Sequence, residues 1–241
     1  MDVGLHTGAS HLQMLENWQA VISSNLANSS TPGFQKSVFE IARVTPEENG
    51  ENLLQSTLPV GNVLRAFSEG QIRITGNPYD LAIQSGGFFA LAGENGEQVY
   101  TKDGEFHLNS DGTLVNKMGW PVLAEGAPLT VVLEEGPITI SPDGTVNQKG
   151  QDIGRISVYN FANPQALEQG NGSYFTDPEG LAGPVMEEDP LVLQGQLMGS
   201  TVNPLTEMVN MIQVSRAYEI TQKLIQENDE RGSAAIRTFS V

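Results

Sequence analysis

The sequence predicts an α+β protein, with a helix at each end of the chain and a mostly antiparallel β domain between them. Two observations support this prediction. Apolar residues recur at helical spacing near both ends of the chain. Between the ends lie short strand-like runs, separated by Asp-Gly and Asn-Gly pairs that are typical of tight turns. We therefore expect a helix, a β middle and a second helix, with the two termini adjacent.

The N-terminal helix is predicted from an apolar stripe whose members are separated by steps of 3, 3, 4 and 4 residues. This spacing is close to a heptad seam, so one helix face is suited to packing. The other face carries Gln, Asn, Ser and Ala with very few charges, and we infer that both faces are covered in the working state. The stripe consists of Leu12, Leu15, Trp18, Ile22 and Leu26.

The C-terminal helix is predicted to begin at Asn203, a good N-cap, with Pro204 in the first helical position. It carries two apolar stripes, which indicates more than one packing surface. We expect the helix to end near Asp229, with Gly232 as the breaker. One stripe is Leu205, Met208, Val209 and Ile212, and the other is Met211, Val214, Tyr218 and Ile225.

The β domain is expected over residues 70–176. Turn pairs recur within it at Asp103-Gly104, Asp111-Gly112 and Asp143-Gly144, and each can supply the positive φ of a hairpin turn. Residues 37–69 and 177–200 are less regular, and we expect them to be connectors. Residues 1–36 and 201–241 then form a terminal helical domain.

Charge and composition exclude several classes of protein. The chain has 12 Lys and Arg against 29 Asp and Glu, for a net charge of −17, which argues against binding to nucleic acid or anionic lipid. It has no cysteine, so disulfides and thiolate chemistry are absent. No segment is apolar enough for a transmembrane helix, and the N-terminus lacks the basic region of an ordinary secretory signal.

Residues with catalytic or metal-binding chemistry form no convincing pattern. The three histidines lack metal-ligand spacing, and the fragments "NSDGTL" and "SPDGTV" lack the downstream carboxylates of a calcium loop. We therefore expect no enzyme activity, no cofactor, no metal and no small-molecule substrate. An enzyme such as a wall hydrolase, or a secreted β-rich glycan-binding module, remains as an alternative of a different class.

The stretch "NLANSSTPGFQ" is predicted to end the first helix and redirect the chain. We expect Asn28 to take the left-handed conformation and stop the helix. Pro32 disfavours helical geometry at Thr31, and Gly33 permits positive φ in a turn. Phe34 is expected to anchor the exit by packing against the C-terminal helix or a neighbouring subunit.

Four segments, in order, resemble signatures of the flagellar basal-body rod protein family. "NLANSSTPGFQK" resembles the N-terminal signature, and "EGQIRITGNPYDLAIQSGGFFAL" resembles the central one. "YTKDGEFHLNSDGTLVNKMGWPVL" resembles the run that follows, and "VNPLTEMVNMIQVSRAYEITQKLIQ" resembles the C-terminal signature. The departures are few, such as Ser85 in place of a usual glycine and Tyr79 in place of leucine.

The resemblance implies a structural subunit that self-assembles helically as part of a drive shaft and export channel. The terminal helices would pack together as a coiled-coil-like pair, line an inner tube and fold fully only on incorporation, while the β domain faces outward. The implied partners are further copies, other flagellar rod proteins and the type III export apparatus, with peptidoglycan or basal-body ring proteins as further candidates. The implied location is the periplasmic rod, reached without a cleaved signal.

The chain length favours a proximal position in the rod, with a distal rod protein or another axial protein as the alternative. The residues expected to carry subunit packing are the helical stripes and two residues of the turn. They are Leu12, Leu15, Trp18, Ile22, Leu26, Asn28, Phe34, Leu205, Met208, Val209, Met211, Ile212, Val214, Tyr218 and Ile225.

Overall fold

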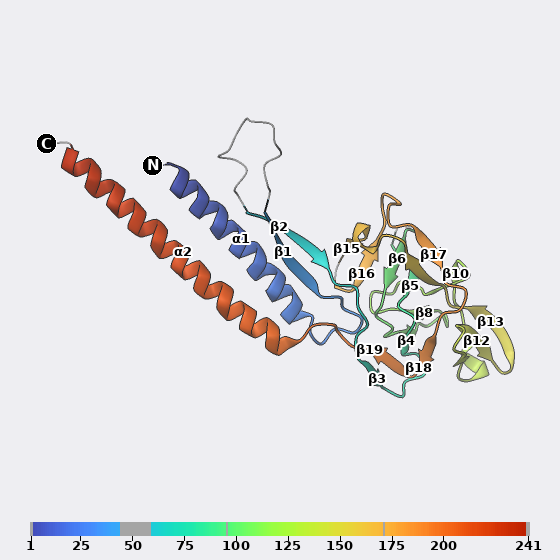
Figure 1. Ribbon diagram of the computed structural model, residues 1–241. Helices are drawn as coiled ribbons and strands as arrows, with labels where there is room; N and C mark the ends of the chain where they lie inside the picture. Colours follow the sequence, from blue (N-terminus) through green and yellow to red (C-terminus); the bar gives the residue numbers. More distant parts are fainter. Residues whose placement is uncertain (1, 44–58, 95, 171, 240–241) are drawn as a thin grey trace. The chain divides into compact units, whose positions relative to one another are not determined.

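The structure is a computed structural model that describes residues 2–43, 59–94, 96–170 and 172–239. The chain divides into two compact units. One unit, called here the helical unit, comprises Met1–Ala27, Ser37–Arg65 and Asn203–Val241. The other, the β unit, comprises Asn28–Lys36 and Ala66–Val202. Two helices and many antiparallel strands confirm the predicted α+β class (Figure 1). None of the described helices has the length and apolar character needed to cross a membrane.

The helical unit contains two long helices and one strand pair. Helix α1 spans Asp2–Ala27 and α2 spans Pro204–Phe239. Strands β1 (Ser37–Arg43) and β2 (Pro59–Arg65) pair antiparallel, with Val38 opposite Leu64. Figure 1 shows α1 lying between α2 and this strand pair. The strand pair thus lies within residues 37–69, where the sequence analysis expects a connector.

The start of α2 is as predicted, but its end is not. The side-chain oxygen of Asn203 accepts hydrogen bonds from the backbone N–H groups of Leu205 and Thr206, at 3.1 and 3.3 Å. The expected end near Asp229 is wrong, because the helix continues through Gly232 to Phe239. A glycine inside a helix costs only about 1 kcal/mol relative to alanine, and the strong helix formers Ala234 and Ala235 follow it.

The end of α1 follows a different mechanism from the one predicted. The helix ends at Ala27, but Asn28 keeps a negative φ, so the expected left-handed stop is wrong. A turn closes instead, in which the N–H of Thr31 donates to the carbonyl of Asn28 at 3.1 Å. The left-handed residue is Gly33, with φ +68°, as its position in the stretch predicts.

The β unit is built from short antiparallel strands. Its largest sheet has six strands in the order β15-β16-β6-β5-β14-β17, and smaller sheets pair β3 with β19, β4 with β18, β7 with β8, β9 with β10, and β11 with β12 and β13. The strands from β3 to β10 are Ile72–Ile74, Leu81–Ile83, Phe88–Ala92, Gln98–Thr101, His107–Leu108, Leu114–Val115, Leu123–Ala124 and Ala127–Pro128. Those from β11 to β19 are Thr139–Ile140, Thr145–Gln148, Gln151–Arg155, Val158–Phe161, Glu168–Gln169, Tyr174–Thr176, Pro184–Met186, Val192–Gln194 and Gln196–Met198.

Turn glycines connect many of these strands. Gly112 and Gly144, in two of the predicted Asp-Gly turns, have φ +79° and +84°. Gly104, in the third, is not left-handed, and a side chain there would collide with the carbonyl oxygen of Leu81. The Asp103-Gly104 pair therefore serves close backbone approach rather than a positive-φ turn.

Two apolar clusters hold the β unit together. The larger one packs Phe89 and Leu91, from one face of β5, with side chains such as Phe106. The smaller one is aromatic and contains Phe88 and Phe175, with ring centroids 5.8 Å apart in an edge-to-face arrangement. Strands β17 to β19, in the segment expected to be a connector, extend this architecture by pairing with β14, β4 and β3.

Candidate functional site

The residues predicted to carry subunit packing fall into three groups by exposure. Leu15, Ile22, Phe34 and Val214 are buried. A second group is half-buried and comprises Leu12, Trp18, Leu26, Asn28, Met211, Tyr218 and Ile225. The third group is exposed and comprises Leu205, Met208, Val209 and Ile212.

The second α2 stripe lies against α1. Val214 joins Leu15 and Ile22 of α1 in one buried apolar cluster, and Met211 and Tyr218 pack on it. The hydroxyl of Tyr218 also donates to a carboxylate oxygen of Glu16 at 2.9 Å. Most of this stripe therefore packs inside the helical unit. It consists of Met211, Val214, Tyr218 and Ile225.

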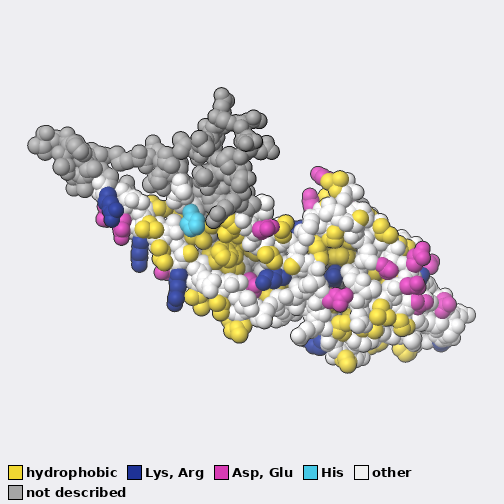
Figure 2. Space-filling model, viewed as in Figure 1, with side chains coloured by type: hydrophobic (Ala, Val, Ile, Leu, Met, Phe, Trp, Pro, Cys, Tyr) yellow, Lys and Arg dark blue, Asp and Glu magenta, His cyan; other side chains and the backbone are white. Residues whose placement is uncertain are grey.

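The first α2 stripe has no cover within the described residues. Leu205 is 73% exposed and Ile212 is 54% exposed, with Met208 and Val209 near one half. Figure 2 shows hydrophobic side chains along the first half of α2, with Lys and Arg side chains farther along the helix. A row of exposed apolar side chains on one helix face is typical of a surface that binds another protein.

The strand pair of the helical unit is attached to α1 by an aromatic contact. The rings of Trp18 and Phe39 stack, with centroids 6.1 Å apart and an interplanar angle of 11°. A side chain at Gly61 would collide with the Phe39 ring, so the glycine leaves room for it. Trp18 therefore contacts the strand pair as well as the seam with α2, which the helical spacing alone did not indicate.

A buried polar contact joins three elements of the helical unit. The side-chain amide of Asn25, near the end of α1, donates to the carbonyl of Ser37 at 2.8 Å and accepts from its N–H at 3.0 Å. The same amide nitrogen lies 3.4 Å from a carboxylate oxygen of Glu207, in the first turn of α2. Asn25 and Glu207 are each 1% exposed. This contact connects the end of α1, the start of β1 and the start of α2.

The signature turn over residues 28–36 belongs to the β unit and is held by several backbone contacts. The N–H of Gly33 donates to the carbonyl of Met198 at 2.8 Å, and the N–H of Thr201 donates to the carbonyl of Phe34 at 3.1 Å. The side-chain oxygen of Gln35 accepts from the N–H of Ser68 at 3.0 Å. Phe34 itself is 1% exposed. The turn is thus fastened to segments distant from it in the sequence.

Gly33 also makes a close backbone contact with the segment after β6. A Cβ atom at this position would lie 2.2 Å from the backbone nitrogen of Asp103 and from the carbonyl carbon of Lys102. Atoms cannot approach so closely, and the neighbouring atoms are backbone, which has little freedom to yield. Glycine is therefore required for two reasons, the positive φ and the space.

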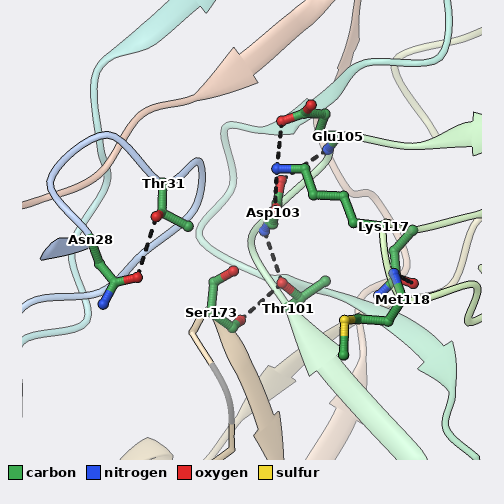
Figure 3. A network of polar contacts seen from close by, with 9 residues as sticks. Asn28, Thr31, Thr101, Asp103, Glu105, Lys117, Met118 and Ser173 are labelled. Atoms are coloured by element: carbon green, nitrogen blue, oxygen red, sulfur yellow. Dashed lines mark hydrogen bonds and ion pairs between the residues drawn. The ribbon is translucent and has the colours of Figure 1, made fainter. Parts of the chain in front are cut away.

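The residues beneath this contact form a partly buried charged network (Figure 3). Lys117 pairs with Glu105 at 2.8 Å and lies 3.9 Å from Asp103. The carboxylate of Asp103 accepts from the N–H of Glu105 at 3.0 Å, but burial raises the pKa of Asp103 to about 6. Burial also lowers the pKa of Lys102, whose ammonium lies 5.0 Å from the centre of the Phe88 ring.

The sequence predicts the turn at Gly33 but not the buried roles of Asn25 and Asp103. Asn25 is a polar residue on the helix segment that carries the apolar stripe, and that position was the available signal. Asp103 gave no signal beyond its turn pair, because its burial depends on segments distant in the sequence. Among the described residues, no group of three or more His, Asp or Glu side chains could hold a metal ion.

Three segments of the chain match known families. Residues 5–35 match the family described as "Flagella basal body rod protein", and residues 193–238 match "Flagellar basal body rod FlgEFG protein C-terminal". Residues 82–148 match "Flagellar hook protein FlgE/F/G D1 domain". The first match contains the signature turn up to Gln35, and the second contains the start of α2.

Whole-length relatives carry corresponding names. The chain is 31% identical to the flagellar basal-body rod protein FlgF of Caulobacter vibrioides, over 98% of this chain and 97% of the relative. It is also 31% identical to FlgF of Salmonella typhimurium, over the full length of both. It is 34% identical to FlgG of Buchnera aphidicola subsp. Acyrthosiphon pisum, over 87% of this chain and 89% of the relative. The chain therefore belongs to the FlgF/FlgG family of flagellar basal-body rod proteins, which is a family of structural proteins and not of enzymes.

Proposed function

We propose that this chain is a structural subunit of the bacterial flagellar basal-body rod that assembles through its terminal helices. The observation that carries the proposal is the exposed stripe of α2, Leu205, Met208, Val209 and Ile212. Inside a rod, neighbouring subunits would bury this stripe and gain about 25 cal/mol for each Å² of apolar surface removed from water.

In the assembled rod, we propose that α1 and α2 act as a coiled-coil-like pair that lines the inner tube. The shared cluster of Leu15, Ile22 and Val214 supports the pairing. The helical unit would form the assembly domain, including the strand pair that the sequence analysis expects to be a connector, and the β unit would form the outer domain. The acidic character of the β unit, with 18 acidic against six basic side chains, suits a solvated outer layer.

We also propose a proximal, FlgF-like position, with a distal one as the alternative. Relatives named FlgF align over 97% or more of their own length, whereas the FlgG proteins of Buchnera and Borreliella align over 89% and 94% of theirs. The partners would be further copies, other rod proteins and the type III export apparatus, with peptidoglycan or ring proteins around the rod. Antibody labelling of isolated hook–basal bodies tests the position: label near the inner membrane supports the proximal assignment, and label near the hook the distal one.

The role of the α2 stripe is tested by replacing Ile212 with glutamate. Because Ile212 is 54% exposed, Ile212→Glu should leave the unfolding midpoint of the isolated chain unchanged. A buried charge in the assembled interface should lower the amount of chain in purified basal bodies by about tenfold or more, which corresponds to about 1.4 kcal/mol or more. Quantitative mass spectrometry measures this amount.

The matched control is Gln213→Glu, which adds the same charge at the next exposed position of the same helix. It should be incorporated as the unchanged chain is. Equal incorporation of the two variants would contradict the role of the stripe, and absence of the unchanged chain from basal bodies would contradict the proposed function.

A further inference from the structure

Among the described residues of the helical unit, the exposed large hydrophobic side chains lie on α2 and on the β1–β2 strand pair, and none lies on α1. On the strand pair, Ile41 and Val63 are 46% and 51% exposed on the face that carries Phe39. On the other face, Val38 and Leu64 are 40% and 41% exposed. They are directly opposite each other in the register, so both project from the same face of the pair.

That face of the strand pair is the one directed away from α1. Successive side chains on a strand alternate between its two faces, and Phe39 stacks on Trp18 of α1. Val38 and Glu40 therefore share the opposite face with Leu64. We call Val38, Glu40 and Leu64 the hairpin face.

Charge is complementary between the hairpin face and the α2 stripe. Arg216 follows Ile212 by one helical turn and therefore continues the exposed stripe, while Glu40 stands two residues from Val38. Both side chains are exposed, and neither has an ion-pair partner among the described residues. An α2 stripe placed on a hairpin face would set Ile212 near Val38 and Leu64, and Arg216 near Glu40.

A rod also requires two different surfaces on each subunit. If a patch binds its own copy, the contact closes into a dimer, whereas an open helical filament needs one patch to bind a second, different patch. The α2 stripe and the hairpin face satisfy the requirement for a head-to-tail contact.

We infer that the α2 stripe of one copy docks on the hairpin face of a second copy, with Arg216 of the first paired to Glu40 of the second. This inference rests on the proposed rod function and names the surface that the stripe binds. It makes the β1–β2 strand pair an assembly element.

Disulfide cross-linking tests the contact directly, because the chain has no cysteine of its own. Two singly substituted chains, Val38→Cys with an epitope tag and Ile212→Cys without one, are expressed together. Hook–basal bodies are then purified and oxidised, and dimers are analysed on non-reducing gels. We expect a dimer that contains both chains, and none when either variant is expressed alone. The matched control replaces Ile212→Cys with Gln213→Cys and should give at least fivefold less dimer.

Several results would overturn the inference. A dimer of Ile212→Cys with itself would show stripe-to-stripe contact, and a cross-link to a different rod protein would show another occupant. Normal incorporation of both cysteine variants without a mixed dimer would also overturn it, while leaving the proposed function intact. Absence of the unchanged chain from the basal bodies would instead defeat the proposed function itself.

Charge exchange provides an independent test of the ion pair. Arg216→Glu and Glu40→Arg should each lower incorporation roughly two- to fivefold, in keeping with an exposed charge pair. The variant that carries both substitutions recreates the pair between copies and should recover most of the loss. Additive losses in the double variant would contradict the pairing.

Discussion

At Gly33 the backbone has φ +68° and lies against the backbone of Lys102 and Asp103. Gly76 provides a matched comparison, since its φ is +76° but nothing lies within 4 Å of a Cβ placed there. Gly76→Ala should cost about 1–2 kcal/mol, from the left-handed conformation alone. Gly33→Ala should cost more than about 3 kcal/mol, because backbone must also move apart. Urea unfolding measures both, and equal losses would contradict the close contact.

Asp103 makes the stability of the β unit depend on pH. Its pKa is raised from 3.8 to about 6 by burial, so folding favours the protonated form. This group contributes up to about 3 kcal/mol to the free energy of unfolding. The contribution is fully present below pH 3.8 and is lost as the pH rises through about 6. Asp103→Asn keeps an oxygen that can accept the Glu105 N–H. The variant should therefore unfold at higher urea concentration than the unchanged chain at pH 7.5.

The same comparison at pH 4 is the internal control for Asp103. There the unchanged chain is largely protonated at Asp103, so the advantage of Asp103→Asn should nearly vanish. Asp111→Asn, at an exposed turn, removes the same formal charge and controls for the change in net charge. An Asp103→Asn variant that is less stable than the unchanged chain at pH 7.5 would show that its carboxylate is stabilised by Lys117 after all.

At the scale of the elements, the Asn25 contact holds α1, β1 and α2 together. Asn25→Ala should destabilise the helical unit by about 2–4 kcal/mol, because the N–H and carbonyl of Ser37 and the buried Glu207 each lose a partner. Circular dichroism at the helix bands during thermal unfolding measures the loss. Asn17→Ala, at an exposed position of the same helix, is the control and should change the midpoint little. A comparable shift for both variants would mean that Asn25 acts only through helix propensity.

The elements that the sequence predicted correctly are those with strong local signals. The periodic stripes and the Asn203 cap located both helices, and the alternation with glycine turns located the middle strands. The β1–β2 pair was missed because its partners lie far apart in the sequence, as Val38 and Leu64 do. The sequence does not predict the end of α2 correctly, because Ala234 and Ala235 offset the helix-breaking tendency of Gly232.

At the scale of the whole molecule, the signature motifs predicted the family, which whole-length relatives confirm. The motifs did not reveal how residues 28–36 are used. Their backbone is hydrogen-bonded to Met198 and Thr201, and the side-chain oxygen of Gln35 accepts from the N–H of Ser68. The turn is therefore part of the β unit although it follows directly on α1. Contacts between distant segments leave no repeating pattern of residues in the sequence, so only the folded chain shows them.

The division of the chain has a mechanical consequence. The backbone passes between the helical unit and the β unit four times, after Ala27, Lys36, Arg65 and Val202. Two bodies joined by one peptide strand can swivel about its single bonds, whereas four covalent crossings share an applied twist among them. In a shaft that turns under load, torque that passes from one unit to the other would therefore be shared among four backbone strands.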